Sequence, residues 1–217
     1  MCGRYVARKL RWADYAAQPH FEEFSETKLA ARFNIAPSQQ VPVVRLDKNG
    51  DRVGDLVRWG LIPSWAKGKP KQQLINARAE TIVTSPMFWQ AFVRRRCLQL
   101  ADGFYEWRME DGVKQPYFLR LASAAAFAFA GIWERWKGEQ DAQPIDTCCH
   151  ITTTPNAIVR PIHDRMPVIL HPEDYPAWLD SKTDSVTLQS LLKPPPDGEL
   201  VAYPVSRSVI ALLGEQD

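Results

Sequence analysis

Short runs of apolar residues separated by turn-forming residues make up the pattern of hydrophobic and polar positions along the chain. Two separating segments, Lys48-Asn49-Gly50 and Asp111-Gly112, are hairpin signals because Asn, Asp and Gly readily take the positive φ values of tight turns. We expect the runs that flank each turn to pair antiparallel. Runs of this kind predict strands at 41–46, 52–59, 97–101, 103–107, 116–119, 125–133, 147–154, 168–170 and 200–205.

Helical spacing of apolar residues is confined to a few segments. Residues 5–33 carry apolar side chains at near-helical intervals and predict one or two short helices. A further helix is expected to begin at a cap on Thr84 or Ser85 and to end before Arg94, and the segment 172–179 predicts another.

The predicted strands outnumber the helices, and hairpins rather than crossover helices join them. This arrangement predicts an α+β fold built mostly on antiparallel sheet. The sequence contains no internal repeat and no clean boundary, and its 217 residues suffice for one core. We therefore expect a single domain over residues 1–217, with a tail that frays from about residue 208.

Composition indicates an ordinary globular protein, with 45% hydrophobic and 24% charged residues. The longest apolar runs fall well short of the roughly 20 residues that a membrane helix needs, and the N-terminus lacks a secretion signal. We expect a cytoplasmic protein without a membrane partner, and a monomer. The formal net charge of +2 permits a nucleic-acid partner without arguing for one.

Cysteines and histidines are too sparse for a disulfide scaffold or an evident metal site. The sequence has no CxxC or HExxH spacing, so we expect reduced thiols, no metal and no cofactor. The residues concerned are Cys2, Cys97, Cys148, Cys149, His20, His150, His163 and His171.

Cys2 is the most unusual position in the chain. If the initiator Met1 is removed, Cys2 becomes an N-terminal 1,2-aminothiol, with an amine pKa near ~8 and a thiol pKa near ~8.5 that a nearby cation or hydrogen-bond donor would lower. The amine would form a Schiff base with an aldehyde, and the thiolate would then close a thiazolidine ring. The alternative is that Cys2 is a small buried residue without a chemical role.

Three other polar residues lie where chemistry is plausible. Glu106 stands between two aromatic residues, so desolvation would raise its pKa toward the range useful for proton transfer, unless it points to solvent. His163 lies in a segment bounded by prolines and is either a proton shuttle or a structural histidine. Asn76 and Arg78 would share one face of an extended segment.

Several arginines and one tryptophan are candidates for binding a nucleic-acid strand. Arg4, Arg78 and Arg165 each have a guanidinium that fits a phosphate, although isolated arginines more often form surface ion pairs. Trp65 lies in a predicted loop, where it would stack beside a base. The run Arg94-Arg95-Arg96 is more typical of a solvated helix end than of a binding patch.

Seven segments, in order and spanning nearly the whole chain, together resemble the SRAP family, the SOS-response-associated peptidase or abasic-site-processing proteins. Any one of these motifs is weak, whereas the ordered set is highly specific. The segments are Met1-Cys2-Gly3-Arg4, Asn34-Ile35-Ala36-Pro37, Trp59-Gly60-Leu61-Ile62-Pro63-Ser64-Trp65, Asn76-Ala77-Arg78-Ala79-Glu80-Thr81, Asp102-Gly103-Phe104-Tyr105-Glu106-Trp107, Ile162-His163-Asp164-Arg165-Met166-Pro167 and Pro204-Val205-Ser206-Arg207.

The resemblance implies an open barrel-like sheet and a role in the response to DNA damage. Cys2, freed of Met1 by autoproteolysis, would form a covalent cross-link with the ring-opened abasic site in single-stranded DNA, and AP-lyase activity is possible. The catalytic companions of Cys2 would be Asn76, Glu106 and His163. The DNA-binding residues implied by the resemblance are Arg4, Asn34, Pro37, Trp65, Arg78 and Arg165.

Two other functions stay open at this point. One is a thiol peptidase with Cys2 as nucleophile and His163 as base, and the other is a non-catalytic module that binds single-stranded DNA. The cross-linking function further predicts that Cys2 is accessible and lies beside Asn76, Glu106 and His163.

Overall fold

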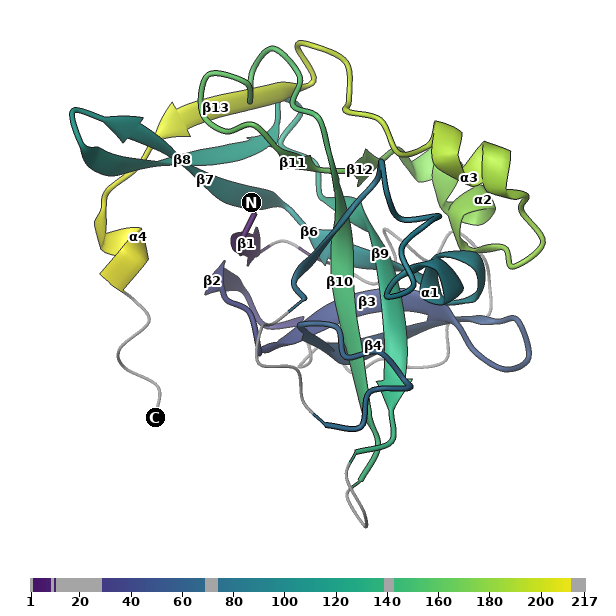
Figure 1. The fold of residues 1–217 in the computed structure, drawn as a ribbon. Helices are drawn as coiled ribbons and strands as arrows, with labels where there is room; N and C mark the ends of the chain where they lie inside the picture. The colour runs from purple at the N-terminus through teal and green to yellow at the C-terminus, as the bar shows by residue number, and fades with distance from the viewer. Residues whose placement is uncertain (1, 9, 11–28, 69–73, 139–142, 212–217) are drawn as a thin grey trace.

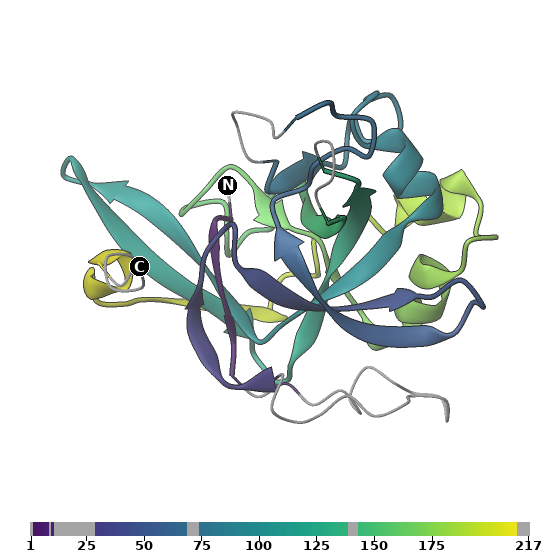
Figure 2. The same ribbon diagram turned by 90° about the horizontal axis from the view of Figure 1, so that it is seen from below.

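Two β-sheets form the molecule in the computed structural model, which describes residues 2–8, 10, 29–68, 74–138 and 143–211. The first sheet has five strands in the order β13-β8-β7-β1-β2, all paired antiparallel. Its β7–β8 hairpin extends away from the rest of the molecule (Figure 2). The strands are β1 (Arg4–Ala7), β2 (Arg32–Ile35), β7 (Gly103–Glu110), β8 (Val113–Leu121) and β13 (Leu200–Pro204).

The second sheet closes on itself. Pairings run from β4 to β3, β6, β9 and β10, and β10 pairs back to β4, so five strands form a barrel (Figure 1). The predicted α+β, barrel-like and mostly antiparallel fold is confirmed. The strands of this sheet are β3 (Gln40–Leu46), β4 (Arg52–Trp59), β5 (Asn76–Arg78), β6 (Arg96–Ala101), β9 (Phe127–Trp136), β10 (Ile145–Thr153), β11 (Met166–Pro167) and β12 (Ile169–Leu170).

Short helices cover the outside of the sheets. The first two α-helices contact β6, and with the third they lie on one side of the barrel, whereas α4 lies on the opposite side of the molecule (Figure 1). None of the helices in the described segments is long and apolar enough to cross a bilayer. The helices are α1 (Trp89–Arg94), the 3-10 helix η3 (Pro172–Asp174), α2 (Tyr175–Leu179), α3 (Ser185–Ser190) and α4 (Ser208–Ala211).

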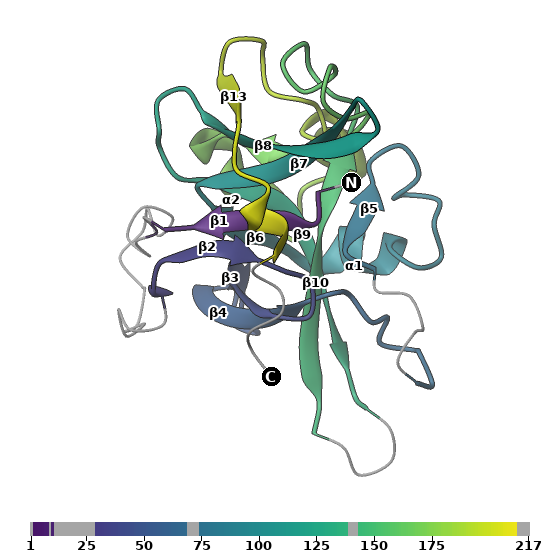
Figure 3. The same ribbon diagram turned by 90° about the vertical axis from the view of Figure 1, so that its left-hand side faces the viewer.

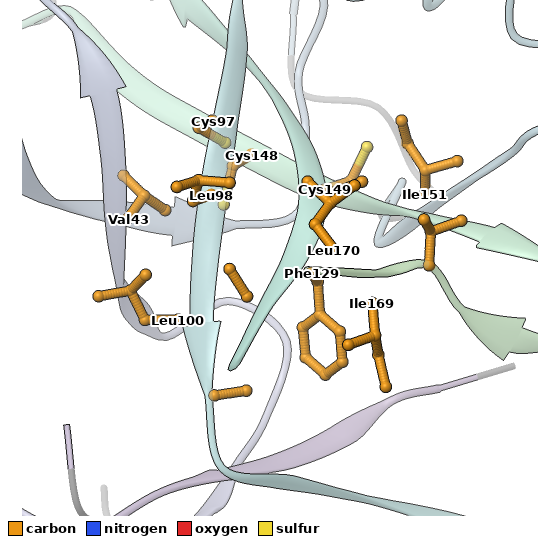
Figure 4. Close-up of a cluster of buried hydrophobic side chains, with 14 of the residues drawn as sticks. Val43, Cys97, Leu98, Leu100, Phe129, Cys148, Cys149, Ile151, Ile169 and Leu170 are labelled. Atoms are coloured by element: carbon orange, nitrogen blue, oxygen red, sulfur yellow. The ribbon is translucent and has the colours of Figure 1, made fainter. Parts of the chain in front are cut away.

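Aromatic contacts join the two sheets into one core. Tyr5 of β1 meets Trp59 of β4 and Phe129 of β9 edge to face, with ring centroids 5.4 and 5.8 Å apart. Figure 4 shows Phe129 among aliphatic side chains, with Cys148 and Cys149 close by. All four cysteines are buried and free, as expected for reduced thiols.

Most predicted strands are confirmed within a few residues, and so are both hairpins. Gly50 and Gly112 have φ values of +88° and +77°, which a tight turn requires of them. The predicted helix at 172–179 is present as η3 followed by α2.

The helices predicted within residues 5–33 are wrong where the structure describes this segment. Residues 5–7 belong to β1 and residues 32–33 to β2, while 11–28 lie outside the described residues. Tyr5 and Ala7 of β1 pack in the main core and Val6 packs in a second apolar cluster with Tyr105 and Phe118, so all three are buried. An apolar run covered on both faces lacks the alternation that marks a half-exposed strand.

Two further boundaries differ from prediction. Helix α1 begins at Trp89 rather than near Ser85, although the Ser85 hydroxyl accepts from the Met87 N–H (3.4 Å) and the Ser85 carbonyl accepts from the Trp89 N–H (3.0 Å), as expected of a capping residue. The tail does not fray at residue 208: α4 spans Ser208–Ala211, and the Asn34 amide donates to the Val209 carbonyl (2.9 Å). Residues 212–217 lie outside the described part.

Candidate active site at the junction of the two sheets

Cys2 lies where the first sheet meets the barrel. Arg4 pairs with Tyr105, so the residues that precede β1 run along β7 toward Glu106. From the barrel side, Asn76 Nδ2 donates to the Cys2 carbonyl oxygen at 3.2 Å. Figure 3 shows the N-terminus near β7 on one side and β5 and β10 on the other. Three segments that are distant in sequence therefore meet around Cys2.

Cys2 is buried, which corrects the expectation that it is accessible in this chain. Its exposed fraction is 0%, because the sheet junction covers it, and its Sγ lies 3.7 Å from the Arg4 carbonyl oxygen as a hydrogen-bond donor. Burial raises the pKa of the thiol well above its usual value, and the negative charge of Glu106 raises it further. We expected a lowered thiol pKa; the effect has the opposite sign because burial and a carboxylate both disfavour a thiolate.

Glu106 is a buried carboxyl group. Only 1% of the residue is exposed, which excludes the alternative that it points to solvent. Burial raises its pKa to about 8, and the negative charge of Asp164 acts in the same direction. A carboxyl group with a pKa near neutrality can both donate and accept a proton at working pH.

His163 faces Glu106 from a turn of the chain. Its Nε2 lies 4.0 Å from Glu106 Oε2, and its Nδ1 accepts a hydrogen bond from the Arg165 N–H (3.0 Å). Burial lowers the pKa of His163; Asp164, with Oδ1 2.9 Å from Nδ1, opposes the shift but does not overcome it.

His150 also belongs to this site, although we considered it only as a possible metal ligand. It is fully buried, and β5 and β10 pair in parallel so that His150 lies opposite Asn76. Its ring centroid lies 5.3 Å from that of Trp59 and 5.1 Å from that of Phe129. Burial lowers the pKa of His150 to about 3, so the ring is neutral. A histidine inside an apolar strand run was the available signal, but the pairing with Asn76 cannot be read from sequence.

The three candidate phosphate-binding arginines differ in their surroundings. Arg78 is exposed two residues after Asn76 on β5. Arg4 is half-buried, donates to the Gly3 carbonyl (2.7 Å), and has a pKa lowered by burial. Arg165 forms a two-pronged ion pair with Glu80, at 2.6 and 2.9 Å, and also donates to the Thr152 carbonyl (2.7 Å).

The remaining candidate DNA-binding residues are Asn34, Pro37 and Trp65. Trp65 is 61% exposed in a loop, Pro37 is half-buried, and Asn34 sits on β2, bonded to α4. The structure thus brings Asn76, Glu106 and His163 together around Cys2.

The expectation of a solvated arginine run holds only for Arg94. Arg95 pairs with Glu134 at 2.6 Å. Arg96 is 4% exposed because its guanidinium donates to four backbone carbonyls that end α1 and α2. Among the described residues, no group of three or more His, Cys, Asp or Glu side chains is arranged to hold a metal ion.

Comparison with known proteins identifies the family. A sequence profile described as "SOS response associated peptidase (SRAP)" matches residues 1–212. The chain belongs to the SRAP family. A similar protein, "Abasic site processing protein YoqW" of Bacillus subtilis (strain 168), is 43% identical over 213 residues, which cover 96% of this chain and 94% of YoqW.

A more distant SRAP relative matches the same share of this chain at a lower sequence identity. "Abasic site processing protein YedK" of Escherichia coli (strain K12) is 30% identical over 96% of this chain and 94% of its own length. Among solved structures, the X-ray crystal structure of a protein from Bacteroides thetaiotaomicron superposes with a TM-score of 0.85 at 27% identity, covering 97% of this chain and 94% of that one. The similarity in sequence to YedK and in fold to the Bacteroides protein thus extends along nearly the whole chain.

Proposed function

We propose that this SRAP protein is a sensor of abasic sites in single-stranded DNA that captures the damaged sugar covalently through Cys2. The names of its relatives, abasic site processing proteins, support the substrate class. The observation that carries the proposal is Glu106: a buried carboxyl group with a pKa of about 8, beside both the Cys2 thiol and His163. A carboxylate paired with a cation at the surface keeps a low pKa and would not exchange protons near neutral pH.

The proposed reaction has two bond-forming steps. The Cys2 amine adds to the aldehyde carbon of the ring-opened sugar, and loss of water gives an imine. The sulfur then adds to the imine carbon, and the thiol proton passes through Glu106 to the nitrogen, which closes a thiazolidine. Because the thiol pKa is raised, sulfur addition needs such an acceptor.

His163 and Asn76 have supporting roles in this scheme. The abasic sugar is mostly a closed hemiacetal, and only its open form carries an aldehyde. His163, whose Nε2 lies 4.0 Å from Glu106 Oε2, would move the proton that opens the ring. Asn76, which donates to the Cys2 carbonyl, would hold Cys2 against the substrate.

Removal of Met1 is a necessary part of the proposal. A Cys2 nitrogen that carries Met1 is an amide, which cannot form an imine, and Cys2 is buried in the chain that begins with Met1. We infer that the protein releases Met1 by its own peptidase chemistry and that release frees the Cys2 amine. Glu106 is the group placed to move protons in that hydrolysis as well.

Binding of the DNA strand would rely on the arginines, Asn34, Pro37 and Trp65 rather than on the proposed catalytic residues. Arg4 and Arg78 flank the site and would contact phosphates, and Arg165 would do so if its pairing with Glu80 still allows a phosphate to approach. Asn34, Pro37 and Trp65 would line the path of a kinked strand, with Trp65 as the stacking residue. A missing base makes bending there inexpensive, so shape can select the lesion.

The structure offers less support to a conventional thiol peptidase. Such an enzyme uses a thiolate stabilised by a lowered pKa, whereas burial and Glu106 raise the pKa of Cys2. Cleavage of the DNA strand by β-elimination from the imine, the AP-lyase reaction, would compete with ring closure and would appear as a shortened oligonucleotide in the mass spectra of the test below.

The test mixes Met1-processed protein with a single-stranded oligonucleotide that carries one abasic site. Intact mass spectrometry should find a heat-stable adduct, short of protein plus DNA by one water. Cys2→Ala should lack the adduct, and Cys149→Ala, which also removes a buried thiol, should keep it. Full adduct with Cys2→Ala would refute the proposal. Acylating the amine of the processed protein should abolish capture, whereas a thiol peptidase would retain its activity.

A further inference from the structure

His150 combines three features that the proposed reaction has not used. It is polar yet fully buried, it is held between the rings of Trp59 and Phe129, and it lies directly opposite Asn76 in the β5–β10 pairing. A histidine is an expensive choice for such a position unless its ring nitrogens meet a polar partner.

The main chain of Cys2 is a polar partner available to the His150 ring. Neither ring nitrogen of His150 makes a hydrogen bond of normal geometry within the described segments. The Cys2 main chain is nevertheless close enough to oppose the effect of burial on the pKa of His150, as a carbonyl acceptor does. The same carbonyl already accepts from Asn76 at 3.2 Å, and a carbonyl oxygen has two lone pairs.

We propose that His150 is a positioning residue, whose neutral ring donates to the Cys2 carbonyl and, with Asn76, sets the direction of the Cys2 amine and thiol. This inference rests on the proposed function of Cys2. Two donors on one carbonyl, from adjacent strands, restrict rotation of the short segment that precedes β1. A nucleophile held in one orientation loses less entropy on reaching the transition state.

Neutrality of the ring makes this role distinct from proton transfer. Glu106 and His163 are the groups whose protons move in the proposed reaction, and His150 stays uncharged while they do so. A positively charged His150 ring close to Cys2 would also repel the cationic intermediates of imine formation and so raise their free energy. A neutral donor supplies direction without that cost.

The experiment compares His150→Leu, which removes the donor and keeps an apolar side chain, with His150→Gln, which keeps a donor. His171→Gln, at a half-exposed histidine beside Glu199, is the matched control. Capture of the abasic oligonucleotide is measured in single turnover over a range of DNA concentrations. Melting temperatures and the carbonyl 13C resonance of Cys2 without DNA are recorded for each variant.

We expect His150→Leu to lower the rate at saturating DNA about tenfold, the effect of one lost hydrogen bond in the transition state, and to leave the half-saturating DNA concentration within about twofold. His150→Gln should restore most of the rate. The Cys2 carbonyl resonance should move in His150→Leu and not in His171→Gln. If His150 were purely structural, His150→Leu would alter the melting temperature. It would not lower the rate at saturating DNA selectively, and His150→Gln would not restore that rate.

An unchanged rate in a folded His150→Leu protein, or an unmoved Cys2 resonance, would overturn the inference. If wild-type protein forms no adduct, the proposed function fails, and the Cys2 resonance by itself then supports or refutes the contact with His150. The two failures are therefore distinguishable.

Discussion

Two regions of this molecule bury charged groups, and they do so in opposite ways. Near the far end of β3, Arg45 is 7% exposed and donates to Asp146 at 2.6 Å and to Asp55, and its guanidinium lies 4.1 Å from the Trp133 ring centroid. Arg135 completes the cluster with two further bonds to Asp146, at 2.7 and 2.8 Å.

At the sheet junction, by contrast, Glu106 faces a thiol, a histidine and Asp164. Burial would raise the pKa of Asp146 as well, but the hydrogen bonds from Arg135 and Arg45 outweigh it and the pKa falls; at Glu106 burial dominates and the pKa rises to about 8. The same kind of side chain is therefore a fixed anion in one region and a proton carrier in the other. The neighbours decide which.

Replacing the central carboxyl of the junction should produce the largest effect on activity. Glu106→Gln should slow adduct formation about 100-fold or more, because the proton carrier is lost, and should not reduce the melting temperature. Single-turnover capture assays and thermal unfolding check this. Arg45→Leu should leave the capture rate of the folded protein unchanged; an equal slowing in that variant would erase the distinction between the two regions.

Breaking the arginine cluster should instead affect stability. Arg45→Leu leaves Asp146 and Asp55 facing each other with only Arg135 as a cation, and should lower the free energy of unfolding by about 3 kcal/mol in urea titrations. Lys114→Ala, at an exposed position on β8, should change it by less than about 0.5 kcal/mol. A loss for Arg45→Leu as small as that of the control would contradict a structural role.

The pH dependence of stability should differ in sign between the regions. Glu106 has a folded pKa above its unfolded value of about 4.3, so it contributes stability at low pH that is lost as pH rises toward about 8. Asp146 has a lowered folded pKa, so its contribution is lost as pH falls through the acid range. Unfolding from pH 2 to 9 should show that Glu106→Gln removes the decline in stability between about pH 4 and 8, and that Asp146→Asn removes the decline below about pH 4. Parallel curves would refute this assignment.

The smallest expected effect, and the simplest to measure, is a change in thiol reactivity. In the chain that carries Met1, burial should protect Cys2, Cys97, Cys148 and Cys149 from iodoacetamide, since each has a raised pKa. After removal of Met1, Cys2 should react faster than the other three cysteines, because the charge of its own freed amine favours the thiolate. Peptide mapping by mass spectrometry measures both states, and rapid labelling of Cys2 before processing would show that it is not covered.

Much of the fold could be predicted from local pattern. Hairpin turns at Gly50 and Gly112 and the apolar runs beside them identified the strands, since these signals lie within a few residues of one another. Failures came where tertiary packing overrides local pattern: β1 looks helical because both of its faces are buried, and α4 is stabilised by a contact with Asn34 on β2.

The sequence by itself determined which reactive groups are present and the order in which they occur, including Cys2, Asn76, Glu106 and His163. Only the tertiary structure decided their states. Burial of Cys2, the pKa of about 8 at Glu106 and the place of His150 opposite Asn76 all depend on strands that pair across 70 or more positions of the chain. Desolvation and charge coupling are set by such neighbours in space, and no local pattern encodes them.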